Sequence, residues 1–261
     1  MAKSLAIILF IFISCSARAQ SWEVGGFAGG AGYMGDLNPN NPLKISGISA
    51  GAFVKRNFNG YLSARLAYTY GKISGADSTS GNQQFRDRNL SFSTRLNEVS
   101  LTGEFNFMEY IPSISHNIYT PYIFAGIALT DYNPQATYQG QTYDLRPLMT
   151  EGQSKPYPNS TIAIPYGVGI KYNFSGRLNL IADIGYRYAY TDYLDDVSGL
   201  YADKSKLPNS LSVALSDRSG ERTGVYTGTA GTQRGDLRPT DTYLFVGFSI
   251  SYTFITSKCY Y

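Results

Sequence analysis

The sequence is poor in charge and nearly lacks tryptophan, histidine and cysteine. Charged residues make up 16% of its 261 residues, whereas about a quarter is typical of a soluble domain. Beyond the first residues no apolar run approaches the length of a transmembrane helix, so we expect none. The chain has instead 23 tyrosines and 27 glycines, with many small polar residues between them. This composition favours strands joined by polar turns over a helical enzyme.

Residues 1–19 are predicted to be a signal peptide. Lys3 provides a basic start, residues 5–13 form an apolar core too short to span a bilayer, and Ala17 and Ala19 form a small-residue cleavage site. Cleavage removes Lys3 and Arg18 and no acidic residue, which lowers the net charge from +3 to +1. This value gives no reason to expect a nucleic-acid partner. Only Cys259 then remains, so no internal disulfide is expected.

Most of the remaining chain alternates between apolar and polar or small residues with a period of two. On the clearest segments, one parity is rich in Leu, Ile, Val, Phe and Tyr, and the other in Gly, Ser, Thr and charged residues. The clear segments are residues 61–73, 96–107, 162–174, 178–190 and 244–254, and weaker ones cover 22–34, 45–58 and 119–131. About eight such strands match the pattern of a membrane barrel.

The connections between these segments alternate in length. Tight turns fall at 57–60 and 174–177, with a moderate turn near 112–117, whereas long polar segments cover 74–91, 132–159 and 191–240. Aromatic residues gather near both strand ends, as in the two interfacial girdles of outer-membrane barrels. We therefore predict a single domain over residues 20–261. Its fold is an eight-stranded antiparallel transmembrane β-barrel of the outer membrane, with short periplasmic turns and long extracellular loops.

Charged residues also lie at strand centres, on the face that would point into the barrel. A lumen of eight strands is only wide enough for side chains, so a general porin is not expected. We expect the charges to pair across the lumen as a structural network rather than to form an ion path. The network comprises Arg65, Glu98, Glu104, Lys171, Asp183 and Arg187.

The sequence offers little for catalysis. Its single histidine, His116, falls in a connection placed on the periplasmic side, away from the outer rim where barrel enzymes carry their sites. A histidine-based triad or a histidine-rich metal site is therefore excluded there, and the protein is predicted not to be an enzyme and to need no cofactor. In the last loop, Asp192, Asp195, Asp196 and Asp203 lack the spacing of a calcium loop, so an interpretation as turn and cap residues is favoured.

The last strand carries a weak export pattern. Gly247 is followed at three and five residues by Ile250 and Tyr252. This resembles the C-terminal signal read by the outer-membrane assembly machinery, a partner that we therefore expect.

Several stretches resemble one family of barrels from Bacteroidota. They are residues 22–26 with 33–39, residues 56–58, the segment TDYLDDVSG from Thr191, and residues 234–236 with 243–254. The most specific is TDYLDDVSG, which contains Asp192, Asp195 and Asp196. The family is the PorG-like barrels, accessory components of the type IX secretion system. The resemblance implies a non-catalytic barrel tied to a periplasmic PorK–PorN ring, and it transfers no catalytic residue.

Two hypotheses about function follow. The first is an accessory or anchoring barrel of type IX secretion, embedded in outer-membrane lipid. The alternative is a stand-alone surface barrel that binds a ligand or partner through its long extracellular loops.

Overall fold

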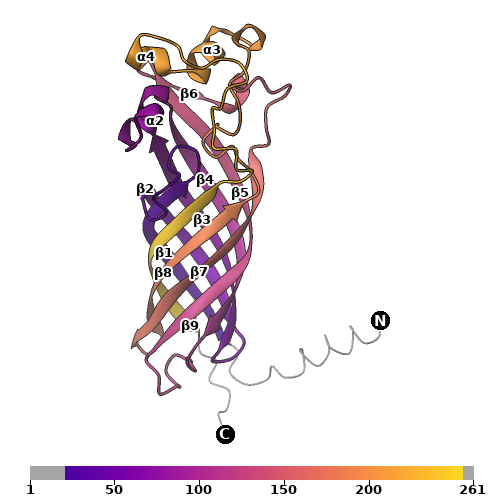
Figure 1. Cartoon of the computed structure of the whole chain (residues 1–261). Coiled ribbons are helices and arrows are strands. Elements are labelled where there is room, and N and C mark those ends of the chain that lie inside the picture. The colour runs from indigo at the N-terminus through magenta and orange to yellow at the C-terminus, as the bar shows by residue number, and fades with distance from the viewer. Residues whose placement is uncertain (1–20, 255–261) are drawn as a thin grey trace, which may run out of the picture.

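Eight long strands pair antiparallel and close into a barrel in the computed structural model, which describes residues 21–254 (Figure 1). Closure comes from the pairing of the first strand with the last, where Trp22 lies opposite Phe254. The predicted eight-stranded antiparallel barrel is thus confirmed. The predicted signal peptide and Cys259 lie outside the described residues. The barrel strands are β1 (Ser21–Met34), β2 (Ile45–Asn57), β3 (Leu62–Ala76), β4 (Ser91–Asn106), β5 (Tyr119–Tyr138), β7 (Ser160–Ser175), β8 (Leu178–Ala189) and β9 (Thr242–Phe254).

The two faces of each strand have opposite chemistry. Along β4, residues from Phe92 to Asn106 are buried at every second position, and the intervening residues face outward. Val99 and Leu101 are about half exposed on that outer face, and equivalent apolar residues continue around the other strands. A surface of this kind is unfavourable in water but is what hydrocarbon requires. The period-two pattern of the sequence therefore becomes an apolar outer belt around a polar lumen.

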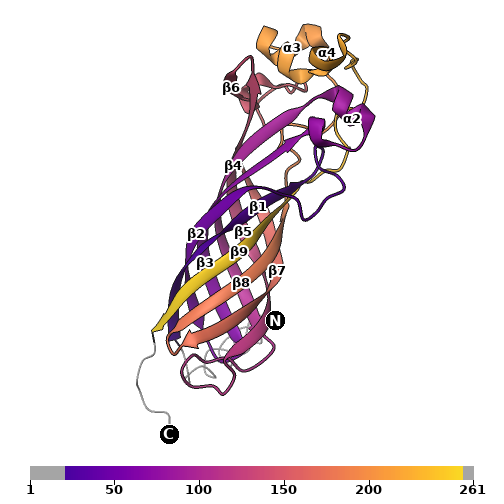
Figure 2. The ribbon, with the colours of Figure 1, turned by 90° about the vertical axis from the view of Figure 1, so that its left-hand side faces the viewer.

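The belt stops before some strands do. Beyond Val99, the next outward positions on β4 are Asn97 and Arg95, which pair with Asp131 and Asn133 of β5. Strands β3, β4 and β5 thus project past the apolar belt (Figure 2). Strand β4 begins at Ser91, where the predicted loop 74–91 ends, and β5 continues past the expected end at Asp131 to Tyr138. Polar outward residues there are compatible with strands that extend beyond the apolar belt.

The two ends of the barrel differ in size. At the turn end, residues 58–61, 107–118 and 176–177 make short connections. At the loop end, residues 35–44, 77–90, 139–159 and 190–241 form a cap over the barrel (Figure 1). The cap contains a short strand, β6 (Gln141–Asp144), three helices, α2 (Gln83–Arg88), α3 (Ser210–Ser216) and α4 (Ser219–Thr223), and the 3-10 turns η1 (Asp77–Thr79), η2 (Arg146–Leu148) and η3 (Lys204–Lys206). None of the helices in the described chain has the length and apolar character to cross a membrane.

Glycine allows a close approach where β1 meets β9. Gly29 lies directly opposite Gly247. A Cβ atom on either residue would clash with the backbone of the other strand. The strands that close the barrel therefore depend on glycine at this point.

Candidate functional site

The lumen near the turn end is filled by buried charges centred on Glu104. The Glu104 carboxylate accepts a hydrogen bond from Lys171 Nζ at 2.6 Å, and Lys55 Nζ lies 3.6 Å from the same oxygen. Lys55 also pairs at 2.9 Å with Glu23 on the adjacent strand. These four side chains are at most 2% exposed. Two lysines and two glutamates offset one another here, which is the condition for keeping charge in a lumen this dry.

A second layer lies around Arg65. Its Nη1 atom lies 3.3 Å from the Asp183 carboxylate and 4.0 Å from that of Glu104. The hydroxyl of Tyr122 donates to Asp183 at 2.9 Å, and the guanidinium of Arg65 stacks 3.9 Å from the ring centroid of Phe53. Aromatic rings thus fill part of the space beside the ion pair, and the Phe53 ring adds a cation–π contact.

A third layer lies nearer the cap. Arg187 Nε lies 3.2 Å from the Glu98 carboxylate, and the Tyr243 hydroxyl donates to the same oxygen at 2.8 Å. The Arg187 guanidinium sits 4.5 Å from the ring centroid of Phe245. The structure therefore brings all six sequence-proposed lumen residues into ion pairs.

The lumen is packed rather than open. Beside Arg65, Asp183 and Arg187 lies a small cavity of about 30 Å³, which is large enough to hold ordered water. Arg65 Nε is buried without a hydrogen-bond partner in the protein, and a water in this cavity is suited to accept from it. Within residues 21–254, the side chains at this level leave room for a water rather than a passage for solutes.

The cap continues the core of the barrel. Leu194 and Val197 of the last loop are buried in the same apolar cluster as Leu96 and Phe245 of the barrel wall. Three tyrosines, Tyr132, Tyr157 and Tyr193, stack with centroid separations of 6.3 and 4.4 Å. The last loop is therefore packed into the same core as the barrel wall.

Asp195 and Asp196 hold this loop in place. Asp196 accepts from Thr150 Oγ1 at 2.6 Å and from the Tyr157 hydroxyl at 2.7 Å. Asp195 accepts from the Tyr33 hydroxyl and, at 2.9 Å, from the Val197 amide. Both carboxylates accept hydrogen bonds from within the protein.

Arginines tie the loops of the cap together. Arg234 pairs at 2.9 Å with Glu151 and donates at 2.7 Å to the carbonyl oxygen of Asp196. Arg88 makes a two-pronged contact with Asp77, at 2.7 Å for each bond. It also donates to the carbonyl oxygens of Asp36 and Arg234. These contacts join all four cap loops.

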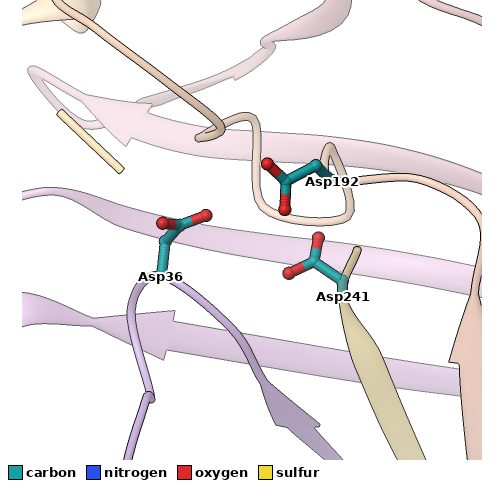
Figure 3. A group of neighbouring side chains, drawn as sticks. All are labelled: Asp36, Asp192 and Asp241. Atoms are coloured by element: carbon teal, nitrogen blue, oxygen red, sulfur yellow. The ribbon is translucent and has the colours of Figure 1, made fainter. Parts of the chain in front are cut away.

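Three carboxylates meet where the cap joins the barrel. Asp36 follows β1, Asp192 begins the last loop, and Asp241 directly precedes β9 (Figure 3). One carboxylate oxygen of each lies within 4.8 Å of the others. All three side chains are buried, with 2%, 8% and 1% exposure. The arrangement of hard oxygen ligands is suited to a cation.

The acidic cluster is electrostatically unfavourable when all its members are ionised. Burial and the nearby Asp236 carboxylate raise the pKa of Asp36 to about 7. Burial and the charge of Asp36 raise the pKa of Asp192 to about 7. The pKa of Asp241 lies well above its usual range because of burial and of these two neighbours. Like charges in a dry site favour the protonated form or a bound cation.

The other sequence-proposed residues lie apart from these groups. His116 is exposed in the connection between β4 and β5. Asp203 caps η3 through the Ser205 amide and is not in the acidic cluster. On β9, Gly247 lies at the β1–β9 contact and Ile250 faces outward, while Tyr252 is partly buried beside Arg177.

Sequence reasoning missed Glu23 and Lys55 in the lumen, and Asp36 and Asp241 in the cap. Glu23 alternates with the outward residues Trp22 and Val24, and Lys55 directly follows the outward Val54. The neighbouring glycines hid that parity. Asp36 and Asp241 sit next to strand ends far apart in the chain, and no local pattern marks them as neighbours.

A closed barrel with an apolar belt and a charge-packed lumen defines the class: an integral membrane β-barrel of the outer-membrane type. Residues 2–209 match the model of a family described as "Domain of unknown function (DUF6089)". The chain belongs to this family. No curated protein matches the sequence.

Solved outer-membrane barrels resemble the chain at low identity. The N-terminal barrel domain of OprF from Pseudomonas aeruginosa shares 12% identity over 90% of this chain and 97% of that chain, with a TM-score of 0.41. Neisserial surface protein A shares 10% identity over 91% of this chain and 98% of that chain, with a TM-score of 0.43. A major outer membrane protein of Thermus thermophilus shares 14% identity over 91% of this chain and 100% of that chain, with a TM-score of 0.45. The fold assignment rests on the pairing of the barrel strands and the closure between β1 and β9.

Proposed function

We propose that this protein is a non-catalytic outer-membrane barrel that serves as an accessory or anchoring component of type IX secretion. The packed lumen supports an anchoring role rather than that of a channel. In it, Glu104, Asp183 and Glu98 are each paired with a lysine or an arginine. A barrel closed in this way has its accessible surfaces at its two rims. The secretion role itself rests on the resemblance of TDYLDDVSG and its companion segments to PorG-like barrels.

In this proposal, the turn end faces the periplasm and contacts a ring of PorK- and PorN-like proteins. Short turns on the periplasmic side are the usual orientation of such barrels. The connection between β4 and β5 offers two exposed isoleucines, Ile114 and Ile118, at 42% and 54% exposure. Apolar residues exposed beyond a membrane rim are suited to protein contact.

Site-specific photocrosslinking in intact cells tests this contact. A photoreactive amino acid at position 114 is expected to capture a periplasmic ring lipoprotein. The same amino acid at position 225, which is exposed in the cap at the opposite end, is the matched control and is expected to capture none. Deletion of the gene is expected to reduce secretion of type IX substrates. Absence of ring crosslinks together with intact secretion in the deletion strain contradicts the proposal.

A specific observation also favours the alternative, a surface barrel that binds a partner through its cap. Val225, Tyr226 and Leu237 expose between 59% and 64% of their surfaces at the loop end. If the crosslinker at position 225 captures a surface protein while the one at 114 captures nothing, the alternative is supported.

A further inference from the structure

We propose that Asp36, Asp192 and Asp241 bind one calcium ion at the mouth of the barrel. These residues differ from the four aspartates of the last loop, Asp192, Asp195, Asp196 and Asp203, that the sequence offered for calcium. The two groups share only Asp192. The inference concerns the barrel and its cap alone and does not depend on a role in secretion.

The spacing of the three carboxylates matches a shared ion. Calcium binds protein oxygens at about 2.3–2.6 Å, so two ligands of one ion lie up to about 5 Å apart. The selected oxygens of Asp36, Asp192 and Asp241 are all within 4.8 Å of one another. Figure 3 shows the side chains converging from three separate segments on one space.

An unpartnered atom gives independent evidence for a ligand. Asp36 is 98% buried, and its Oδ2 atom has no hydrogen-bond partner in the protein. Its other oxygen accepts from the Asp236 amide, which fixes the carboxylate with its side chain directed at the cluster. A buried carboxylate oxygen without a partner is costly. A cation between the three residues would satisfy it.

Nearby arginines form no ion pair with the cluster. Arg88 is engaged with Asp77, and Arg234 with Glu151 and Asp196. Within residues 21–254, the ion pairs closer than 4.0 Å include none between these three aspartates and a lysine or arginine. Three buried carboxylates therefore converge without a paired positive charge, which a divalent cation would supply.

The ligand chemistry selects calcium among common divalent cations. The three side chains of the cluster are carboxylates, with no cysteine or histidine among them, whereas zinc sites in proteins are built mainly from cysteine and histidine. Magnesium demands near-octahedral geometry and retains its waters, while calcium accepts irregular oxygen sets. The ligands come from the first loop and from the two ends of the last loop, an irregular set. A bound calcium would tie the first loop and the last loop to the beginning of β9.

Terbium luminescence tests the site in the full-length mature protein folded in detergent micelles. Terbium replaces calcium at oxygen sites and is sensitised by tyrosine, and the Tyr33 hydroxyl lies 3.4 Å from Asp241. We expect saturable emission on excitation of tyrosine, with one ion bound per barrel, that calcium displaces and magnesium displaces poorly. Absence of saturable, calcium-displaceable emission from the wild-type protein overturns the proposal without recourse to any variant.

Matched variants assign the signal to the cluster. Asp192→Asn and Asp36→Asn are each expected to weaken calcium binding by on the order of tenfold or more, because each removes one charged ligand. Asp203→Asn makes the same change at an exposed position of the same loop and is expected to bind as the wild type does. Folding of each variant is checked by its gel migration before boiling. If folded Asp192→Asn and Asp36→Asn both bind like Asp203→Asn, the ion sits elsewhere and the proposal is overturned.

Discussion

Glu104 is the residue on which the lumen cations converge. It contacts Lys171 at 2.6 Å, Lys55 at 3.6 Å and Arg65 at 4.0 Å, and its side chain is only 1% exposed. Loss of this one negative charge would leave three cations sharing only Glu23 and Asp183. A buried charge left without its partner is far more costly than the pair was favourable.

Glu104→Gln is therefore expected to lower the free energy of unfolding by about 3–5 kcal/mol. Guanidinium titration of the protein in micelles measures this loss. Glu109→Gln, the same change at an exposed turn residue, is expected to have no comparable effect. The double variant Glu104→Gln/Lys171→Met is expected to regain part of the stability, since it removes one orphaned cation. Equal stability of Glu104→Gln and Glu109→Gln would contradict a stabilising role for the lumen ion pairs.

Single residues also mark how far sequence reasoning reaches. Glu98, Glu104 and Arg187 were identifiable because they interrupt strongly alternating strands with charge at inward positions. Glu23 was not, because β1 has glycine at both inward and outward positions, which erases the parity. Lys55 was not, because it lies on β2, where Gly47 and Gly51 weaken the alternation. Asp36 and Asp241 became neighbours only through barrel closure, and no rule acting along the chain brings them together.

At the scale of a strand, the depth of each outward residue decides what it tolerates. Leu101 lies inside the apolar part of β4, between Val99 and Phe105, and opposite Leu66 and Ile127 on the flanking strands. Phe107 follows the end of the same strand, at the turn end of the belt. The two positions thus sample the centre and the edge of the proposed membrane slab.

Leu101→Arg is expected to destabilise the folded barrel in lipid vesicles by about 2–4 kcal/mol, whereas Phe107→Arg is expected to cost at most about 1 kcal/mol. Unfolding in denaturant, followed by tyrosine fluorescence, measures both. Similar costs at the two positions would show that the membrane slab is not centred near Leu101.

The strand ends explain which boundaries the sequence could not supply. A strand is predicted from apolar residues at every second, outward-facing position. This pattern is present only in the part of the strand that lies in the membrane. Beyond Leu129 the outward residues of β5 turn polar, so residues 132–138 were interpreted as part of a loop although they continue the sheet. The hairpin formed by β5 and β6 was missed for the same reason.

For the whole molecule, the closed ladder of backbone hydrogen bonds predicts unusual resistance to detergent. The mature protein is expected to fractionate with the outer membrane and to migrate faster on gels before boiling than after, because the barrel stays compact in detergent. Membrane fractionation and paired boiled and unboiled lanes check this. Recovery as a soluble protein without detergent would refute the membrane assignment.

The contact between β1 and β9 also determines when the molecule can be completed. Trp22 and Phe254 are paired neighbours near opposite ends of the described chain. Every other pair of adjacent barrel strands is nearer in sequence, so this contact carries the greatest loop-closure entropy. We infer that β1 and β9 pair last, when the remaining strands already hold these two edge strands close together. Until then both edges expose unpaired backbone, and the opposed Gly29 and Gly247 let them meet without a side chain having to move aside. Completion of the barrel is thus expected to occur at one glycine-lined contact between β1 and β9.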